Sequence, residues 1–160
     1  MHIRRATDAD WPQLWAIIEP IMRAGETFAL PRDGDEGVAR AYFASAEKVN
    51  FVAEDDGAIL GASYVRANQQ GGGSHIANCG YMTAAAARGR GIARALCSHS
   101  IGYCREAGFK GIQYNFVVST NEAAVHLWQS LGFAIVGTLP GAFDHPTHGF
   151  VDAYVMFRAL

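Results

Sequence analysis

A turn rich in glycine and arginine at residues 88 to 93 carries the clearest chemical signal in the sequence. It reads Arg88-Gly89-Arg90-Gly91-Ile92-Ala93 and lies between an apolar segment that ends at Thr83 and an amphipathic segment that ends at Ala107. Glycines let the main chain approach a ligand closely, and the first turn of a helix presents free N–H groups and the positive end of the helix dipole. The two arginines add positive charge. The turn therefore predicts a binding site for a diphosphate.

The net charge of the chain is small, and its positive charge is concentrated near this turn. Thirteen Lys and Arg stand against 15 Asp and Glu, for a net charge of −2, which excludes the broadly basic surface that binds nucleic acid. Between Arg88 and Lys110, five basic residues accompany a single acid, Glu106. This surplus favours an anion site, although a solvated helix face would give the same pattern.

Two asparagines interrupt segments that otherwise have the apolar character of buried strands. Asn78 lies in the segment 75–83, and Asn115 lies in the segment 112–118. A buried amide without partners is costly, so each side chain needs an explanation. One explanation is that the pair orients a small amino acid, because an amide offers an acceptor to an N–H group and donors to a carboxylate. The other is structural, with one asparagine in a β-bulge and one bonded to the backbone.

Apolar periodicity and turn residues predict an α/β (α+β) fold, with a mixed, mostly antiparallel central sheet flanked by helices. The expected element order is βααβββαβαββ. Strands are expected at 2–6, 49–54, 59–67, 75–83, 112–118, 133–138 and 150–158. The glycine-rich stretch 69–74 is expected to be a hairpin loop, and the polar stretch 139–149 a loop long enough to cover a pocket. With 160 residues, half of them apolar, residues 1–160 are expected to form a single domain.

Capping residues mark the expected starts of two helices. Thr7 with Asp10 precedes the first helix, which runs to about residue 23, and Ser119 with Glu122 forms a capping box before the fourth, which runs to about residue 131. The second helix is expected at 35–46 and the third at 88–107. The third helix would then begin inside the glycine-rich turn.

The pattern Arg88-x-x-Gly91-x-Ala93 resembles the R/Q-x-x-G-x-G/A signature of the GNAT superfamily of N-acetyltransferases. In that superfamily, successive main-chain amides bind the pyrophosphate of acetyl-coenzyme A. The segment 127–133, LeuTrpGlnSerLeuGlyPhe, is similar to the family's L-Y-x-x-x-G-F, and the element order also agrees. The competing dinucleotide fingerprint fits poorly, because Arg94 occupies its third glycine position and alternating βαβ repeats are absent from the expected order.

This resemblance implies a GNAT fold that uses acetyl-CoA as co-substrate, with the pantetheine arm held in a wedge between two splayed strands. It implies a cofactor-binding set made of Tyr81, Met82, Thr83, Arg88, Gly89, Arg90, Gly91, Ile92, Ala93, Asn121 and Trp128. Trp128 stands where the family commonly has a Tyr that protonates the departing thiolate. The thiolate would then leave unassisted, or Tyr81 or a water would supply the proton. Asn121 and Trp128 each have a structural alternative, helix capping and core packing respectively.

A closer resemblance is to the N-acetyltransferases that act on proline analogues such as azetidine-2-carboxylate. It rests on Asn78, Asn115 and Asn121 and on the PheValValSerThr between the last two. It implies that Asn78 contacts the substrate amine and that Asn115 aids catalysis, which makes these two the catalytic candidates. Further candidates for the acceptor pocket are Glu26 and Phe28, in the loop after the first helix, and His145, in the polar loop.

The resemblance leads us to expect direct acetyl transfer to the amine of a small molecule, preferably an amino or imino acid. The alternatives are acetylation of an antibiotic, of a phosphinothricin-like compound or of a protein amine, and a catalytically degenerate sensor that only binds acyl-CoA. A homodimer formed through the last strands is also expected.

The remaining composition predicts neither a metal site nor a disulfide. Cys79, Cys97 and Cys104 are odd in number and lack paired short spacings, so they are expected to be buried, reduced thiols. The histidines show no ligand spacing and are expected at the surface. No apolar signal region or membrane-spanning stretch is evident, which favours a cytoplasmic protein without membrane or nucleic-acid partners.

Overall fold

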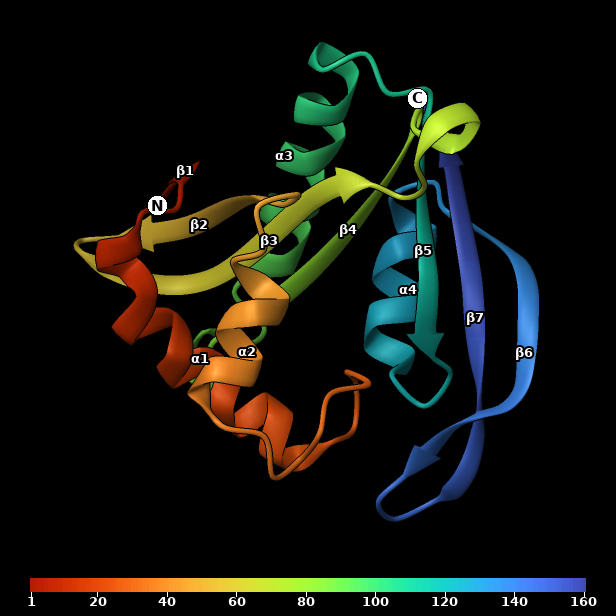
Figure 1. The fold of residues 1–160 in the computed structure, drawn as a ribbon, viewed down its shortest axis with the longest axis horizontal. Coiled ribbons are helices and arrows are strands. Elements are labelled where there is room, and N and C mark those ends of the chain that lie inside the picture. Colours follow the sequence, from red (N-terminus) through yellow and green to blue (C-terminus); the bar gives the residue numbers. More distant parts are fainter.

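The computed structural model describes all 160 residues, and its seven strands form one sheet in the order β1-β2-β3-β4-β5-β7-β6 (Figure 1). Neighbouring strands are antiparallel except for the parallel pair β4 and β5. The strands are β1 (His2–Arg5), β2 (Val49–Asp55), β3 (Ala58–Ala67), β4 (Ile76–Thr83), β5 (Gly111–Val118), β6 (Ala134–His145) and β7 (Gly149–Ala159). The helices are α1 (Trp11–Ala24), α2 (Glu36–Phe43), α3 (Ile92–Glu106) and α4 (Glu122–Ser130). The predicted fold class and element order are confirmed.

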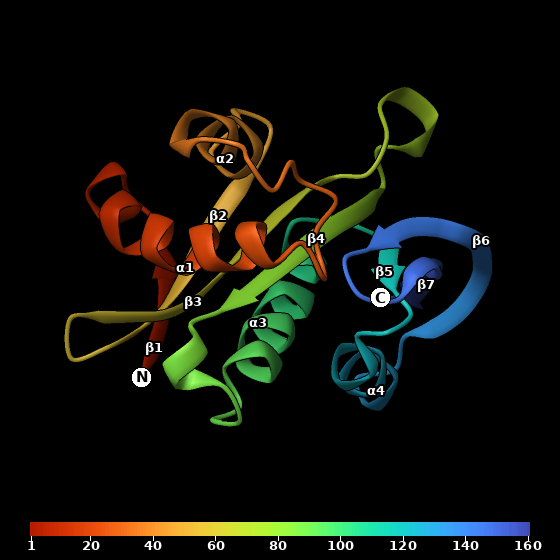
Figure 2. The same ribbon diagram turned by 90° about the horizontal axis from the view of Figure 1, so that it is seen from below.

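The helices cover both faces of the sheet. Figure 2 shows α1 and α2 on one face and α3 and α4 on the other. Because side chains alternate along a strand, Val52 and Ala62 pack in the core beneath α1 and α2, whereas Phe51 and Val65 pack in the core beneath α3 and α4. The sheet therefore separates two apolar cores.

The parallel strands β4 and β5 pair at only two positions, Ile76 with Gly111 and Ala77 with Ile112. Beyond these positions the strands diverge, as Figure 1 shows. Asn78 follows the last paired residue of β4, and its Nδ2 donates to the backbone oxygen of Gln113 at 2.9 Å. The Asn78 side chain thus supplies a hydrogen bond between the two strands at the point where their backbone pairing ends. We call the opening beyond this point the wedge.

The third helix begins at Ile92, four residues later than predicted. Gly89 and Gly91 have φ values of 76° and 79°, in the left-handed region that glycine adopts at little cost. Left-handed residues interrupt the helical hydrogen-bond pattern, so residues 88–91 form a loop before α3. The two glycines thus set the point at which the helix starts.

The predicted capping box at Ser119 is wrong, because Asn121 caps α4. The Oδ1 of Asn121 accepts from the backbone N–H of Ala124 at 3.4 Å. Both residues are of types that cap helices, and only the observed backbone path distinguishes them.

The predicted polar loop 139–149 is also wrong, because β6 continues to His145 and pairs with β7. Pro140 and Gly141 lie where the pairing register shifts between Leu139 and Phe143, and Gly141 has a φ of 57°. Proline and glycine are tolerated at such a bulge. In a sequence, however, this pair of residues usually indicates the end of a strand. A long hairpin replaces the expected loop.

The three cysteines are buried and free, as predicted. Cys97 and Cys104 lie on the inner face of α3, and Cys79 lies on β4 beneath them. None of the helices is both long and apolar enough to cross a membrane.

A charged cluster ties the first strand to the start of α1. Arg4 donates to both carboxylate oxygens of Asp10 at 2.8 Å and to Glu54 at 2.6 Å, and the N–H of Thr7 donates to Asp10 at 2.7 Å. Asp10 is only 6% exposed. The hydrogen bonds from Arg4 hold the pKa of this carboxyl far below its usual range. The ionised form is therefore the one that stabilises the fold.

Replacing Asp10 by Asn is expected to lower the melting temperature by on the order of 5 °C at pH 7, because a charge-assisted network is lost. A carboxyl with a lowered native pKa stabilises the fold above its unfolded pKa of about 4, and this contribution is lost as the pH falls further. The difference in melting temperature between wild type and variant should therefore become smaller below about pH 4. Asp144, which is exposed and unpaired, supplies the control Asp144→Asn. A pH-independent gap would contradict this assignment.

Candidate active site

A cavity of about 870 Å³ occupies the wedge between β4 and β5 and extends to both sides of it. On one side its wall is formed by the segment 85–94, except Ala86 and Arg90, and by α4 with its capping residue, and we call this the turn half. On the other side the wall is formed by α1, the segment 24–30 and the side chains of β3, β4 and β5 that face these elements, and we call this the loop half. The cavity therefore connects two chemically distinct regions through the split in the sheet.

Most of the predicted site residues lie on the wall of this cavity. They are Glu26, Phe28, Asn78, Tyr81, Met82, Thr83, Arg88, Gly89, Gly91, Ile92, Ala93, Asn115, Asn121 and Trp128. Their placement brings the glycine-rich turn and the two asparagines into one cavity, although they are distant in the sequence. The roles assigned to them stay predictions.

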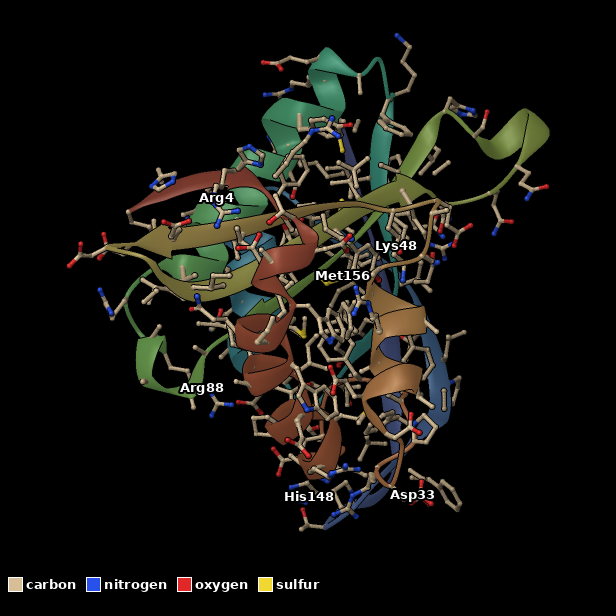
Figure 3. All side chains as sticks on the ribbon, turned by 60° about the vertical axis from the view of Figure 1, so that its left-hand side comes forward. Arg4, Asp33, Lys48, Arg88, His148 and Met156 are labelled. Carbon is tan, nitrogen blue, oxygen red and sulfur yellow. The ribbon has the colours of Figure 1, made fainter.

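The turn half has the features of an anion site. The first backbone hydrogen bond of α3 runs from the N–H of Ala95 to the oxygen of Gly91 at 3.0 Å, so the N–H groups of residues 92–94 have no helical partner. A Cβ built on Gly89 or Gly91 would meet nothing within 4 Å, so a ligand can approach the main chain. Arg88 is exposed at the edge of this half and makes no ion pair (Figure 3). These groups together suit a phosphate-bearing ligand.

Asn121 sits opposite the turn at the start of α4. Its Oδ1 is used in capping, at 3.4 Å from the N–H of Ala124, but its Nδ2 makes no hydrogen bond within the chain. Asn121 therefore caps the helix, which was the structural alternative to a role in cofactor binding. The free Nδ2 leaves a donor for a ligand in the cavity.

An aromatic cluster fills the base of the wedge. The ring of Trp128 lies 4.9 Å from that of Tyr81 and 5.4 Å from that of Tyr114, measured between centroids. The hydroxyl of Tyr114 donates to that of Tyr81 at 3.2 Å. Burial raises the pKa of both hydroxyls well above the usual value, so both remain protonated. Trp128 is 7% exposed and serves as core packing as well as cavity wall.

The two catalytic candidates both hold partners in the loop half. The Nδ2 of Asn115 donates to Oδ1 of Asn68 at 2.7 Å, and its Oδ1 accepts from Nε2 of Gln113 at 2.9 Å. Asn115 also lies where β5 loses its regular pairing with β7, between Tyr114 and Val117. Since Asn78 is bonded to the backbone, the structural alternative describes both asparagines. Both still line the cavity.

Two predicted residues do not lie on the cavity wall. The Nη2 of Arg90 lies 3.6 Å from Oδ2 of Asp55 at the end of β2, and Oδ1 of that carboxylate also binds the terminal ammonium group at 2.7 Å. His145 lies near the end of β6, 7% exposed, with its ring 4.6 Å from that of His148. Its expected place in a pocket loop and its expected exposure are both wrong, because the loop is a strand.

Three polar residues of the loop half, Tyr42, Tyr64 and Arg66, were not predicted from the sequence. Tyr64 and Arg66 are two residues apart on β3 and face the same side of the sheet. The ring of Tyr64 packs on Gly80, where an added Cβ would lie 2.4 Å from Cε1 of the tyrosine. The sequence did offer one signal for this site, because Tyr64 and Arg66 are polar residues at alternate positions of an otherwise apolar strand. No cluster of three or more His, Cys, Asp or Glu side chains suited to a metal ion is present.

Comparison with known proteins agrees with this architecture. Residues 11–133 match the acetyltransferase (GNAT) family. A GCN5-related N-acetyltransferase from Kribbella flavida is 45% identical, with a TM-score of 0.94, over 99% of this chain and 97% of that one. A phosphinothricin acetyltransferase from Sinorhizobium meliloti, solved in complex with AcCoA, is 23% identical, with a TM-score of 0.85, over 99% of this chain and 88% of that one. At 23% identity, this similarity shows only that the two chains share a fold.

Among curated proteins, N-acetyltransferase aca1 of Schizosaccharomyces pombe is 36% identical over 98 residues, which are 61% of this chain and 47% of that protein. The matched part thus spans about half the length of this relative. The family match covers most of the present chain, and the fold and cavity agree with it. The chain therefore belongs to the GNAT family of N-acetyltransferases.

Proposed function

We propose that the chain transfers an acetyl group from acetyl-CoA directly to the amine of a small amino or imino acid, with proline analogues such as L-azetidine-2-carboxylate as the preferred class. The observation that carries this proposal is the single cavity that joins the phosphate-suited turn to a polar loop half through the wedge. The identity to N-acetyltransferase aca1 and the family match support the reaction type. Attack within a ternary complex requires such a continuous passage.

Acetyl-CoA supplies the thioester, and the residues of the turn half fit its diphosphate. The free N–H groups of residues 92–94 and the side chain of Arg88 would bind the phosphates, and Nδ2 of Asn121 would donate from the opposite wall. The edge of β4 beyond Ala77 has no backbone partner on β5. Main-chain groups along a strand point alternately to its two neighbours, and the hydrogen bonds that Ile76 and Ala84 make on the β3 side place the groups of Met82 on that side as well. The main-chain groups of Tyr81 and Thr83 therefore face the wedge and are available to hold the pantetheine arm, and an N–H there can meet the thioester oxygen.

The neutral amine attacks the thioester carbon, so that a C–N bond forms and the C–S bond breaks. CoA leaves as a thiolate, and the nitrogen releases one proton to solvent. The carbonyl oxygen gains negative charge as the amine attacks, and a fixed N–H donor on β4 stabilises it without reorganisation. The protonated hydroxyl of Tyr81 lies at the base of the wedge and can donate a hydrogen bond to the departing sulfur. A thiolate is only moderately basic, so a hydrogen bond suffices where Trp128 offers no acid.

Asn78 and Asn115 would position the amine in the loop half. Their amides stand on the strands that border the wedge, on the side opposite the turn. The amide oxygen of Asn78 has one weak contact, 3.5 Å from the hydroxyl of Tyr64, which leaves it able to accept from a substrate N–H. Glu26 and Phe28 would close the outer side of the same pocket.

A thiol-release assay with a panel of amines tests this function. We expect free CoA to appear with L-azetidine-2-carboxylate and cis-4-hydroxyproline at rates well above those with phosphinothricin, methionine sulfoximine or a peptide with a free N-terminus. Preference for the peptide or for phosphinothricin would replace the proposed acceptor while keeping the reaction. Submillimolar CoA binding without thiol release from any amine would instead support an acyl-CoA sensor.

A further inference from the structure

Arg66 places a positive charge on the floor of the loop half. It lies on β3 directly opposite Asn78 on β4, so the two side chains project from the same face of the sheet. Tyr64, two residues earlier, lies on the same face and contacts Asn78. Arg66 lines the cavity together with these two residues. A cation therefore stands beside the residue proposed to hold the substrate amine.

The charge of Arg66 is weakly compensated within the chain. Its guanidinium makes one hydrogen bond, from Nη1 to Oε1 of Glu47 at 3.4 Å. The side chain of Glu47 is 61% exposed, and that of Arg66 is 29% exposed. A single long contact to an exposed carboxylate contributes little, and most of the five guanidinium donors remain unused. Arg66 can thus bind a second anion without giving up a strong partner.

A second cation, Lys48, lies close enough to Arg66 to interact with its charge, although it does not line the cavity. Lys48 lies between the end of α2 and the sheet, far from Arg88 in the turn half (Figure 3). Its Nζ donates to the backbone oxygen of Tyr42 and lies 3.7 Å and 4.3 Å from the ring centroids of Tyr42 and Tyr64. Burial, and then the charge of Arg66, lower the pKa of Lys48 to about 8. The two cations repel one another and share only Glu47 as an acid.

The other charged residues of the cavity do not neutralise the positive charge of Arg66. Arg88 and Arg94 belong to the turn half, and Arg94 donates to the hydroxyl of Ser130 at 2.9 Å. Glu26 is the one acid on the wall, and it is exposed on the segment 24–30, across the loop half from the sheet. An acceptor with a negative group would therefore place that group at Arg66.

We propose that Arg66 binds the carboxylate of the acceptor, which makes it the residue that selects amino and imino acids over simple amines. This inference rests on the proposed function. In an α-amino or α-imino acid one carbon separates the nitrogen from the carboxylate carbon. Opposed side chains on neighbouring strands start only about 5 Å apart. Asn78 and Arg66 thus match the two ends of such a molecule.

The test compares L-azetidine-2-carboxylate with its neutral carboxamide in the wild type, in Arg66→Gln and in Arg66→Lys. The wild type should favour the carboxylate by about 10- to 100-fold in kcat/KM, the size of one charge-assisted contact. Arg66→Gln should lose this preference through a higher KM, while the KM for acetyl-CoA is unchanged. Arg66→Lys should retain part of it. An unchanged preference in Arg66→Gln would overturn the inference.

Arg40 supplies the matched control, because it also makes one exposed ion pair, at 3.3 Å to Asp8, but lies off this cavity. Arg40→Gln should keep the full preference for the carboxylate, and its loss there would contradict the assignment to Arg66. Calorimetry of L-azetidine-2-carboxylate with the CoA-loaded chain separates the two proposals. Binding that depends on Arg66 without thiol release would reject the proposed function and keep this inference. If the wild type acetylates the carboxylate and the carboxamide with equal efficiency, the proposed function stands and the role assigned to Arg66 is rejected.

Discussion

Affinity for acetyl-CoA is expected to fall by about 100-fold or more when Gly91 is replaced by Asp, equivalent to at least about 2.7 kcal/mol. Gly91 precedes α3 with a φ of 79° and open space around its Cα. An Asp there would place a carboxylate against the phosphates and in the field of the free N–H groups. Calorimetric titration with CoA measures the loss, and the additional change Arg88→Ala should weaken binding further.

The chain offers a closely matched control for this variant. Gly57, in the turn between β2 and β3, has a φ of 78° and likewise nothing within 4 Å of an added Cβ. Gly57→Asp therefore imposes the same backbone cost at a position away from the cavity. It should bind CoA like the wild type. Equal losses in the two variants would assign the effect to strain rather than to the phosphate site.

Turnover is expected to fall by about 100-fold when Asn115 is replaced by Ala, with the affinity for acetyl-CoA nearly unchanged. Loss of a hydrogen-bonding group that orients the reacting centre typically costs this much in rate. Asn115 stands in the loop half, away from the residues proposed to hold the phosphates. Steady-state kinetics together with CoA titration separate the two quantities.

Asn68 distinguishes a direct role of Asn115 from a structural one. It accepts the hydrogen bond from Asn115 but does not line the cavity. Asn68→Ala removes the same bond and should lower turnover much less than Asn115→Ala. If the two variants lose turnover equally, Asn115 acts by supporting β5. A parallel loss of CoA affinity in Asn115→Ala would indicate local collapse.

Periodicity and turn chemistry predicted most of the fold because these signals are local. The order of strands and helices and the buried cysteines follow from side-chain patterns within short windows. The errors arise where one residue type has two uses. Pro140 and Gly141 end many strands but here occupy a bulge, and Ser119 and Asn121 are both good capping residues.

The site was only partly predictable, because its contacts join distant segments. The turn carries its own chemistry in its glycines, so its residues could be named from the sequence. The direction of the Arg90 side chain instead depends on Asp55, at the end of β2, and the place of Arg66 depends on the register between β3 and β4. The divergence of β4 from β5 came from the family resemblance, since nothing in the two strand sequences alone requires it.

The central claim is that the main chain of residues 88–94 holds the two phosphates of CoA and that the thioester lies in the wedge. A crystal structure of the chain soaked with acetyl-CoA tests it most directly. We expect density for the diphosphate within hydrogen-bond distance of the N–H groups of residues 92–94, and for the pantetheine arm between β4 and β5. Density for the cofactor at another surface, with no ligand at this turn, would contradict the account.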